Sequence, residues 1–396
     1  MSLLRQTARR VRGAASPALR QAGRLIGPRA ARSLGPPADY FHSHHIAGYI
    51  GWVRHANLGD EALFDAFVRL FEPLRLVMFE TAPPLELSLY RALVKKGPAY
   101  DAVFLGGGTL ILHTEYLELA HLALRKNYPL IAFGTGVADH EFRRARGADR
   151  DWHGRLREWG ETLKQFRFVG VRGEDSAAAL ESVGVPDVRV VGDPAISACT
   201  PAPADRPASG RVAVNVGSFG PMFGSQDDVT RAVAEVVGAL RDKGFEVDAF
   251  ALHTADERAG QALVDSGIGV RNIWTERTSV DRFSERIGGY DLVIAQKLHG
   301  AVLALARGVP VISLAYEPKC LDFMRSVNMA ELCVRTDELD AQHIASTALS
   351  LLADLGASRE RAIRETNTWR DVQSRHAREL LAGLGLGSSE TSNHSP

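Results

Sequence analysis

The sequence from Asp291 to Lys319 is DLVIAQKLHGAVLALARGVPVISLAYEPK. It contains two short apolar runs, Leu292–Ala295 and Val309–Ala315, which have the length expected of buried β-strands. We expect a helix that begins at Gly300 to connect them. A strand, a helix and a second strand in this order predict an α/β fold with a parallel sheet.

Basic side chains follow both of these predicted strands. Lys297 and His299 lie between the first strand and the helix, and Lys319 follows the second strand. Open α/β sheets bind ligands at the carboxyl ends of their strands, and the free N–H groups of a helix N-terminus favour an anion. We therefore predict a site for a small, multiply charged anion at Lys297, His299, Gly300 and Lys319. His299 is the candidate for proton transfer, because neighbouring cations influence the pKa of an imidazole.

Strand-like and helix-like segments alternate in two successive sets, separated by a Pro/Ala-rich segment, TPAPADRPASG. Two such sets predict two doubly wound, Rossmann-like α/β domains that face each other across a cleft. The expected parts are a disordered basic tail (1–45), an N-terminal domain (46–199), a linker (200–210), a C-terminal domain (211–356), a helix packed across both domains (357–384) and a disordered tail (385–396).

The N-terminal domain supplies further candidates at strand ends. Asn57, Asp60 and Glu61 lie between a predicted strand and a predicted helix, where Asn57 or Asp60 could also act simply as the helix cap. The glycines Gly106, Gly107 and Gly108 follow an apolar strand, and Gly134–Gly136 is expected to form a second glycine turn. Neither segment matches GxGxxG or GxxxxGK[ST], which disfavours a nucleotide cofactor bound in those modes.

Two further residues at strand ends have more than one interpretation. Arg172 precedes Glu174 and Asp175, so it either forms a surface ion pair of little energetic value or uses its planar fork to hold a carboxylate or phosphate. Asp193 directly precedes Pro194 and is expected to be a turn residue. Its alternative role is to shape the interface between the domains.

The composition limits the class of protein. With a formal net charge of +0 over 396 residues, bulk charge gives no reason to expect nucleic-acid binding. Three widely spaced cysteines predict a reduced, cytoplasmic protein, and no spacing typical of metal ligands occurs. Residues 1–38 hold eight arginines and no acidic residue. That tail fits a disordered segment, a segment that contacts an anionic membrane surface or an organelle transit peptide.

The order and spacing of these motifs resemble the polysaccharide pyruvyl transferase family over about residues 48–335. The matching pieces are Asn57–Ala62, Gly106–Gly108, Arg172–Ser176, Gly192–Ala195, Lys297–Ala301, Gly308–Ile312 and Tyr316–Lys319. The resemblance implies a GT-B-like fold of two facing Rossmann-like halves. It also implies transfer of a pyruvyl group from phosphoenolpyruvate to two hydroxyls of a sugar in a cell-surface glycan or lipid-linked precursor, with release of phosphate.

The resemblance also assigns roles to residues. His299 would protonate the enol methylene, while Lys297, Arg172 and Lys319 would hold the carboxylate and phosphate of the donor. Asn57, Asp60 and Glu61 would face the acceptor, and the scheme needs neither a metal nor a cofactor. Lys297 departs from the family, which usually carries Arg at this position. Two alternatives remain: a GT-B-type glycosyltransferase with a nucleotide-sugar donor, and a catalytically silent protein that binds an anion or a glycan.

Overall fold

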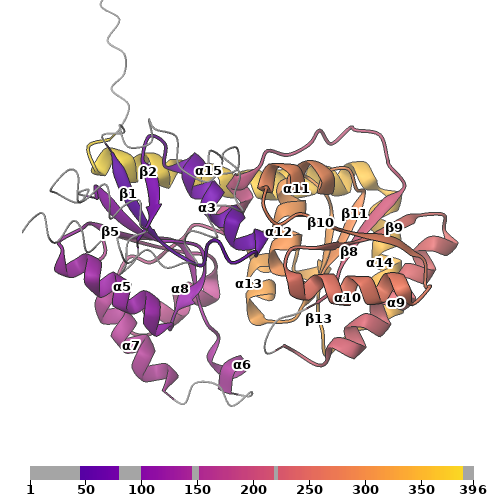
Figure 1. Cartoon of the computed structure of the whole chain (residues 1–396), viewed down its shortest axis with the longest axis horizontal. Coiled ribbons are helices and arrows are strands. Elements are labelled where there is room, and N and C mark those ends of the chain that lie inside the picture. The colour runs from indigo at the N-terminus through magenta and orange to yellow at the C-terminus, as the bar shows by residue number, and fades with distance from the viewer. Residues whose placement is uncertain (1–44, 80–99, 145–150, 218–221, 387–396) are drawn as a thin grey trace, which may run out of the picture. The chain divides into compact units, whose positions relative to one another are not determined.

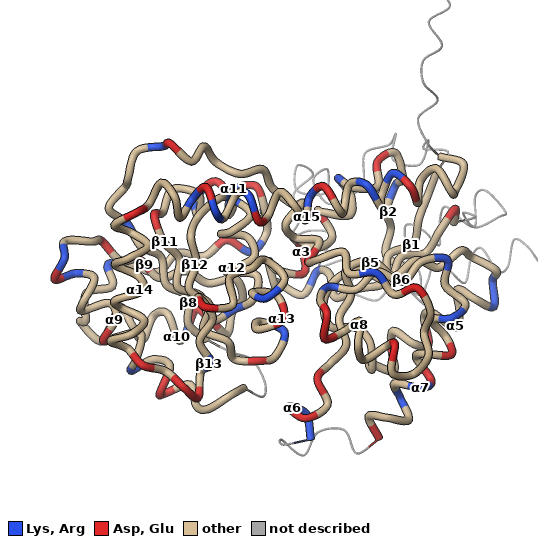
Figure 2. Tube along the Cα trace, turned by 180° about the vertical axis from the view of Figure 1, so that it is seen from behind, with Lys and Arg blue, Asp and Glu red and all other residues tan. Residues whose placement is uncertain are grey.

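The computed structural model describes residues 45–79, 100–144, 151–217 and 222–386. The basic tail up to residue 44 and residues 387–396, on which two of the expectations above rest, lie outside these ranges. No helix within the described ranges combines the length and the apolar character needed to cross a membrane. Figure 2 shows that acidic and basic residues are interspersed along the surface elements of both halves of the described chain.

The first half contains a parallel sheet with, in the described residues, seven strands in the order β2-β1-β3-β5-β6-β7, and β4 pairs with β5 (Figure 1). The strands are β1 (Ile46–Ile50), β2 (Arg75–Met78), β3 (Ala102–Leu105), β4 (Gly108–Ile111), β5 (Leu130–Val137), β6 (Phe168–Val171) and β7 (Arg189–Val190). The described helices of this half are α3 (Leu58–Leu70), α5 (Thr114–Arg125), α6 (His140–Arg144), α7 (Trp152–Leu163), α8 (Glu174–Glu181) and the 3₁₀ turn η2 (Pro194–Ala198).

The second half contains a parallel sheet with, among the described residues, six strands in the order β10-β9-β8-β11-β12-β13. The strands are β8 (Arg211–Asn215), β9 (Glu246–Ala251), β10 (Val270–Thr275), β11 (Leu292–Ala295), β12 (Val311–Ala315) and β13 (Cys333–Arg335). The helices are α9 (Gln226–Asp242), α10 (Thr254–Asp265), α11 (Val280–Ile287), α12 (Leu298–Ala306), α13 (Pro318–Ser326), the 3₁₀ turn η3 (Ala330–Leu332), α14 (Ala341–Ala353) and α15 (Leu355–Gly383).

Both sheets have a point at which the direction of chain winding reverses. In the first sheet, β2 is added on one side of β1 and β3 on the other. In the second sheet, β9 and β10 lie on one side of β8, and β11, β12 and β13 lie on the other. Ligands of doubly wound folds bind at such switch points, at the carboxyl ends of the strands. The loops after β1 and β3, and those after β8 and β11, are therefore where a site is expected.

Two local expectations are wrong. The segment Gly134–Gly136 is not a turn, because β5 continues through it to Val137. Gly134 has a φ of +71°, and the register of β5 against β6 shifts there, so the glycine allows an irregular strand to continue. The helix after β11 begins at Leu298 and not at Gly300, which places His299 in its first turn.

Helices α3 and α15 connect the two halves. Leu58, Ala62 and Ala66 of α3 belong to the same buried apolar cluster as Phe250 and Phe283 of the second half. The start of α3 is also fixed to the second half by a backbone hydrogen bond from Leu58 N to Leu252 O of 3.0 Å. Both halves are thereby held together directly beside the loops that follow β1 and β9.

The C-terminal helix α15, yellow in Figure 1, contacts both halves along its length. Near its start, Arg359 forms a buried ion pair with Asp291 of the second half at 2.6 Å. Further along, Gln373 Nε2 donates to the carbonyl oxygens of Val191 (3.0 Å) and Asp193 (2.9 Å) in the first half. Its last turns join the core of the first half through Ala377 and Leu381.

Candidate functional site

A cavity of about 190 Å³ lies between the two halves at their switch points. Its lining residues come from the loops and helix starts that follow the strands: Asn57, Asp60, Gly108, Thr109 and Arg172 from the first half, and Leu252, Lys297, Leu298, His299, Tyr316 and Lys319 from the second. The first turns of α3, α12 and α13 all contribute side chains to it. Their free N–H groups and dipoles add to the preference for a negatively charged ligand.

Three cationic side chains meet at this cavity. Arg172 is 2% exposed, so the surface ion pair considered for it does not form. Its Nη2 lies 3.5 Å from Thr109 Oγ1, and its Nε has no hydrogen-bond partner among the described residues. Lys297 and Lys319 reach the cavity from the other half. Because buried donors in proteins are nearly always paired, a guanidinium with free donor capacity here is suited to holding an anion.

Lys297 and Lys319 each form an ion pair with a carboxylate. Lys297 Nζ lies 3.5 Å from Oδ1 of Asp256, a fully buried residue of α10, and Lys319 Nζ lies 3.0 Å from Glu317 Oε2. Burial opposes the charged form of Lys319, but Glu317 and Tyr316 outweigh it, so the pKa of its ammonium lies above the ordinary value. Burial raises the pKa of Asp256, while Lys297 opposes that rise. The pairs hold the ammonium groups in place in a site of low polarity.

His299 stands where the two halves touch. A Cβ placed on Gly59 would lie 2.1 Å from His299 Nδ1, so only a glycine fits against this ring. On the other side, His299 Nε2 lies 3.8 Å from Asp193 Oδ2, and neither atom has a hydrogen-bond partner in the described chain. Asp193 is fully buried, and its Oδ1 accepts a hydrogen bond from Ala195 N at 3.0 Å.

The electrostatic surroundings disfavour a charged His299. Burial lowers the pKa of its imidazole to about 4; Asp193 opposes this shift, and Arg172, Lys319 and Lys297 add to it. The imidazole is therefore neutral at pH 7, because Asp193 only partly offsets the effects of burial and of the three cations. An anion bound among the same cations would compensate their charge, and Asp193 would then favour the protonated ring.

Asn57 and Asp60 lie opposite His299. Asn57 caps α3, because its Oδ1 accepts from Gly59 N at 3.2 Å, and its Nδ2 donates to Asp60 Oδ2 at 2.6 Å. Burial raises the pKa of Asp60 to about 7, an effect that Lys319 opposes. A carboxyl group with this pKa exchanges protons near neutrality, as a general base requires. Asn57 is thus the helix cap and also lines the cavity.

The remaining predicted site residues do not line this cavity. Glu61 instead accepts a hydrogen bond from Arg54 N at 2.6 Å and fixes the loop before α3. Gly106 and Gly107 allow close packing against Tyr49 and Leu63, respectively, and Gly300 packs toward Phe250 in the core. Of the three loop glycines only Gly108, with a φ of +97°, borders the cavity.

Sequence reasoning did not assign Asp193 and Asp256 to the site. Asp193 was expected to be a turn residue, and it does start the 3₁₀ turn η2, but its second carboxylate oxygen faces His299. Asp256 lies in the first turn of the helix that follows β9. The rule that sites form at the carboxyl ends of strands applied equally to β9 and could have indicated Asp256.

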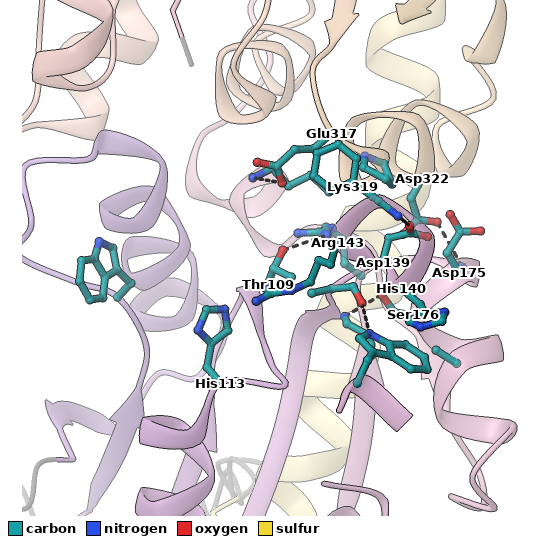
Figure 3. A pocket seen from close by; sticks show the side chains of 18 residues that line it. Thr109, His113, Asp139, His140, Arg143, Asp175, Ser176, Glu317, Lys319 and Asp322 are labelled. Carbon is teal, nitrogen blue, oxygen red and sulfur yellow. Dashed lines mark hydrogen bonds and ion pairs between the residues drawn. The ribbon is translucent and has the colours of Figure 1, made fainter. Parts of the chain in front are cut away.

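A second, larger cavity of about 630 Å³ adjoins the first, and Thr109, Arg172 and Lys319 line both. Figure 3 shows Asp322 of the second half beside Asp175 of the first, whose backbone N donates to Asp322 Oδ1 at 3.3 Å, with His113 apart from them. Apolar residues form much of the remaining wall: Trp52, Val137, Ala138, Phe142, Trp152, Ala179 and Pro318. The described residues contain no cluster of three or more His, Cys, Asp or Glu arranged to hold a metal ion.

Two parallel-sheet halves with a site between them define a GT-B-like fold. UDP-N-acetylglucosamine 2-epimerase from Neisseria meningitidis is similar, with 14% identity, a TM-score of 0.51 and coverage of 86% of this chain and 99% of that one. A UDP-glucosyltransferase from Polygonum tinctorium is similar at 12% identity and a TM-score of 0.51, covering 87% and 99% of the two chains. These likenesses confirm the predicted fold class.

Residues 57–318 match the family model described as polysaccharide pyruvyl transferase. The chain therefore belongs to the polysaccharide pyruvyl transferase family, a family of transferases. It is also 21% identical over 193 residues to the amylovoran biosynthesis protein AmsJ of Erwinia amylovora. That match covers 45% of this chain and only about half (46%) of the length of AmsJ.

Proposed function

We propose that the protein transfers a pyruvyl group from phosphoenolpyruvate to two hydroxyls of a sugar within a polysaccharide or its lipid-linked precursor. The observation that carries the proposal is the small cavity in which Arg172, Lys297 and Lys319 surround His299. Phosphoenolpyruvate is a three-carbon anion with a carboxylate and a phosphate, so it needs several cations in a small space. Family membership and the likeness to a polysaccharide biosynthesis protein support the same activity.

The size of the cavity favours this donor over a nucleotide sugar. Pockets that enclose drug-sized ligands have volumes of about 300–1,000 Å³, whereas this one measures about 190 Å³. A nucleotide sugar is itself of drug size or larger and would need space beyond the three cations. A nucleotide sugar would therefore have to extend from this site into the adjoining cavity of about 630 Å³, whereas phosphoenolpyruvate would not.

The reaction can be assigned to residues step by step. His299, protonated once the donor is bound, gives its proton to the methylene carbon, and positive charge develops at the neighbouring carbon. A sugar hydroxyl attacks that carbon and loses its proton to Asp60. Phosphate then leaves, stabilised by Arg172 and the two lysines. The second hydroxyl closes the ketal; of the two hydroxyl protons, one replaces the proton given by His299 and the other departs with phosphate.

A phosphate-release assay tests this proposal directly. Phosphoenolpyruvate is incubated with the protein and a panel of sugars, oligosaccharides and lipid-linked sugars, and both phosphate and pyruvylated product are measured. We expect phosphate to appear only when an acceptor is present, in a ratio of one to each ketal formed. Thermal stabilisation by a nucleoside diphosphate but not by phosphoenolpyruvate would favour the glycosyltransferase instead. Binding of phosphoenolpyruvate without turnover on any acceptor would indicate a silent binding protein.

The pKa values of His299 and Asp60 predict the pH dependence of kcat/KM. The reacting complex needs a proton on His299 (pKa about 4 in the free enzyme) and an ionised Asp60 (pKa about 7), so the enzyme that binds the donor must hold one proton on this pair. Between these values the pair holds one proton in total, so kcat/KM for phosphoenolpyruvate should be level from about pH 4 to pH 7. Above pH 7 the pair loses that proton, and kcat/KM should fall about tenfold per pH unit.

The pH profile of kcat/KM is measured and corrected for the titration of the phosphate group of phosphoenolpyruvate itself. In Asp60→Asn the descending limb near pH 7 should disappear together with most of the activity. Activity that rises steadily from pH 7 to pH 9 in the unaltered protein would contradict the proton assignment.

Asp256 is expected to act through Lys297. In Asp256→Asn the hydrogen bond from Leu252 N can be kept, but the charge 3.5 Å from Lys297 Nζ is lost. Without it the ammonium is free to move, so the KM for phosphoenolpyruvate should rise about tenfold while kcat changes less. Asp228→Asn, which removes one partner of an exposed ion pair on α9, is the matched control and should change neither constant. An unchanged KM in Asp256→Asn would contradict this role.

A further inference from the structure

The side chain of Trp52 is exposed in the larger cavity, and this position bears on the acceptor. Among the described residues, only Trp52 and Val68 are large hydrophobic side chains that are markedly exposed, at 47% and 45%. Trp52 lines the cavity of about 630 Å³, whereas Val68 lines neither cavity. Exposing an indole to water gives up the stabilisation that its burial would provide. Single exposed apolar residues are common, but the position of this one in a cleft suggests a ligand.

The orientation of Trp52 is fixed by its own loop. Its ring stacks on His55, with the ring centroids 3.7 Å apart and the planes at 16°. Arg54 and Ala56, on either side of His55, have φ values of +70° and +55°, and Glu61 accepts the hydrogen bond from Arg54 N. Since one face of the indole is occupied by His55, the opposite face is the one available for a planar apolar partner.

The rest of the cleft suits a carbohydrate. Trp152 packs into the wall with its Nε1 donating to Ala138 O at 2.8 Å, so its hydrogen-bonding need is met within the protein. The lining of this cavity combines apolar residues with hydrogen-bonding groups such as His113, His140 and Ser176. A pyranose ring has an apolar C–H face and a rim of hydroxyls, and such a mixed wall complements both.

We propose that Trp52 is a stacking platform for a sugar ring next to the one that receives the pyruvyl group. This inference rests on the proposed function and specifies its acceptor as a glycan of at least two residues. The reacting sugar would lie where the two cavities meet, beside Thr109, Arg172 and Lys319. The neighbouring residues of the chain would extend along the larger cavity to Trp52.

Binding can be tested without the reaction. Trp159, Trp274 and Trp152 are at most 9% exposed, and the half-buried Trp369 lines neither cavity, so a ligand that stacks on Trp52 should alter the tryptophan fluorescence mainly through this residue. Because Trp52→Ala lacks this reporter, gluco- and galacto-oligosaccharides of one to four residues are also titrated by calorimetry into the unaltered protein, Trp52→Ala, and Val68→Ala as the control. We expect at least one series to bind about tenfold more tightly as the chain lengthens, and this gain to be lost in Trp52→Ala but kept in Val68→Ala.

Several outcomes separate the platform from its rivals. Trp52→Phe should keep part of the gain, and His55→Ala should weaken it because the stacked partner is removed. A fluorescence change with UDP or GDP and none with any oligosaccharide would overturn the proposal in favour of a nucleobase site. Equal affinity for one and four residues in every series would also overturn it. If phosphate release failed but the oligosaccharides bound as expected, pyruvyl transfer would be refuted while the role of Trp52 in glycan binding would stand.

Discussion

We expect His299→Ala to lower kcat for acceptor-dependent phosphate release by about 10²- to 10⁴-fold, the range that general acid catalysis contributes. In the proposed mechanism Asp60 acts as the base, and Lys297 and Lys319 are paired with carboxylates, so the imidazole is left to deliver the proton to carbon. In the proposed complex the donor contacts the three cations and not the imidazole alone, so its dissociation constant should change far less than kcat. Single-turnover rates and donor titration of the same preparation measure the two quantities separately.

Two further variants distinguish chemistry from structure. His299→Gln keeps a side chain of similar size and should be as inactive as His299→Ala, with an unchanged melting temperature. Gly59→Ala leaves the imidazole intact but places a methyl group 2.1 Å from its Nδ1 position, so it should also reduce kcat strongly. If His299→Gln kept full activity, the proton would have to come from another group and the mechanism above would be wrong.

The second large effect concerns Arg172. Arg172→Ala should raise the KM for phosphoenolpyruvate by about 30- to 4,000-fold, because removing one member of a buried charge pair costs about 2–5 kcal/mol. The KM of Arg172→Lys should lie between that of the unaltered protein and that of Arg172→Ala, since lysine restores the charge but not the planar fork. Steady-state kinetics with varied donor at saturating acceptor gives these constants.

Arg231→Ala is the matched control, because Arg231 forms an exposed ion pair with Asp228 on α9, away from both cavities. Arg172 also lowers the pKa of the buried Asp322, which burial raises, so the melting temperature of each variant should accompany the kinetics. An unaltered KM in a stable Arg172→Ala protein would show that the donor does not contact this guanidinium.

Much of the fold could be predicted from the sequence because its strands are short, apolar and followed by charged residues. The segment after β11 illustrates this: Leu292–Ala295 forms the expected strand, and Lys297 and His299 lie at its carboxyl end. Local patterns failed where the role of a residue depends on packing against a distant part of the chain. Glycines Gly134 and Gly136 suggested a turn, but they keep β5 clear of Pro194 and of Arg172, contacts that no local pattern contains.

The same limit applies to the site. Lys297, His299 and Lys319 share one sheet edge, so the topology of one half suffices to predict that they meet. Asp193 and His299 belong to different halves, and their distance of 3.8 Å depends on how those halves pack. Glu61 is close in sequence to Asn57 and Asp60 but does not line the cavity with them. It accepts a hydrogen bond from Arg54 N and fixes that loop instead. Sequence proximity placed these three residues together, but it could not distinguish the one that supports a loop.

Helix α15 limits how this chain can be recombined with a relative. By sequence it belongs to the second half, but Gln373 holds the carbonyl groups of Val191 and Asp193, and Leu381 lies in the first core. In a chimera joined within residues 200–210, both the helix that contacts the Asp193 carbonyl group and the imidazole that faces the Asp193 carboxylate would therefore come from the relative. Exchanging residues 211–354 while keeping the native α15 would replace only one of these neighbours, which makes it the better design for transferring donor or acceptor preference.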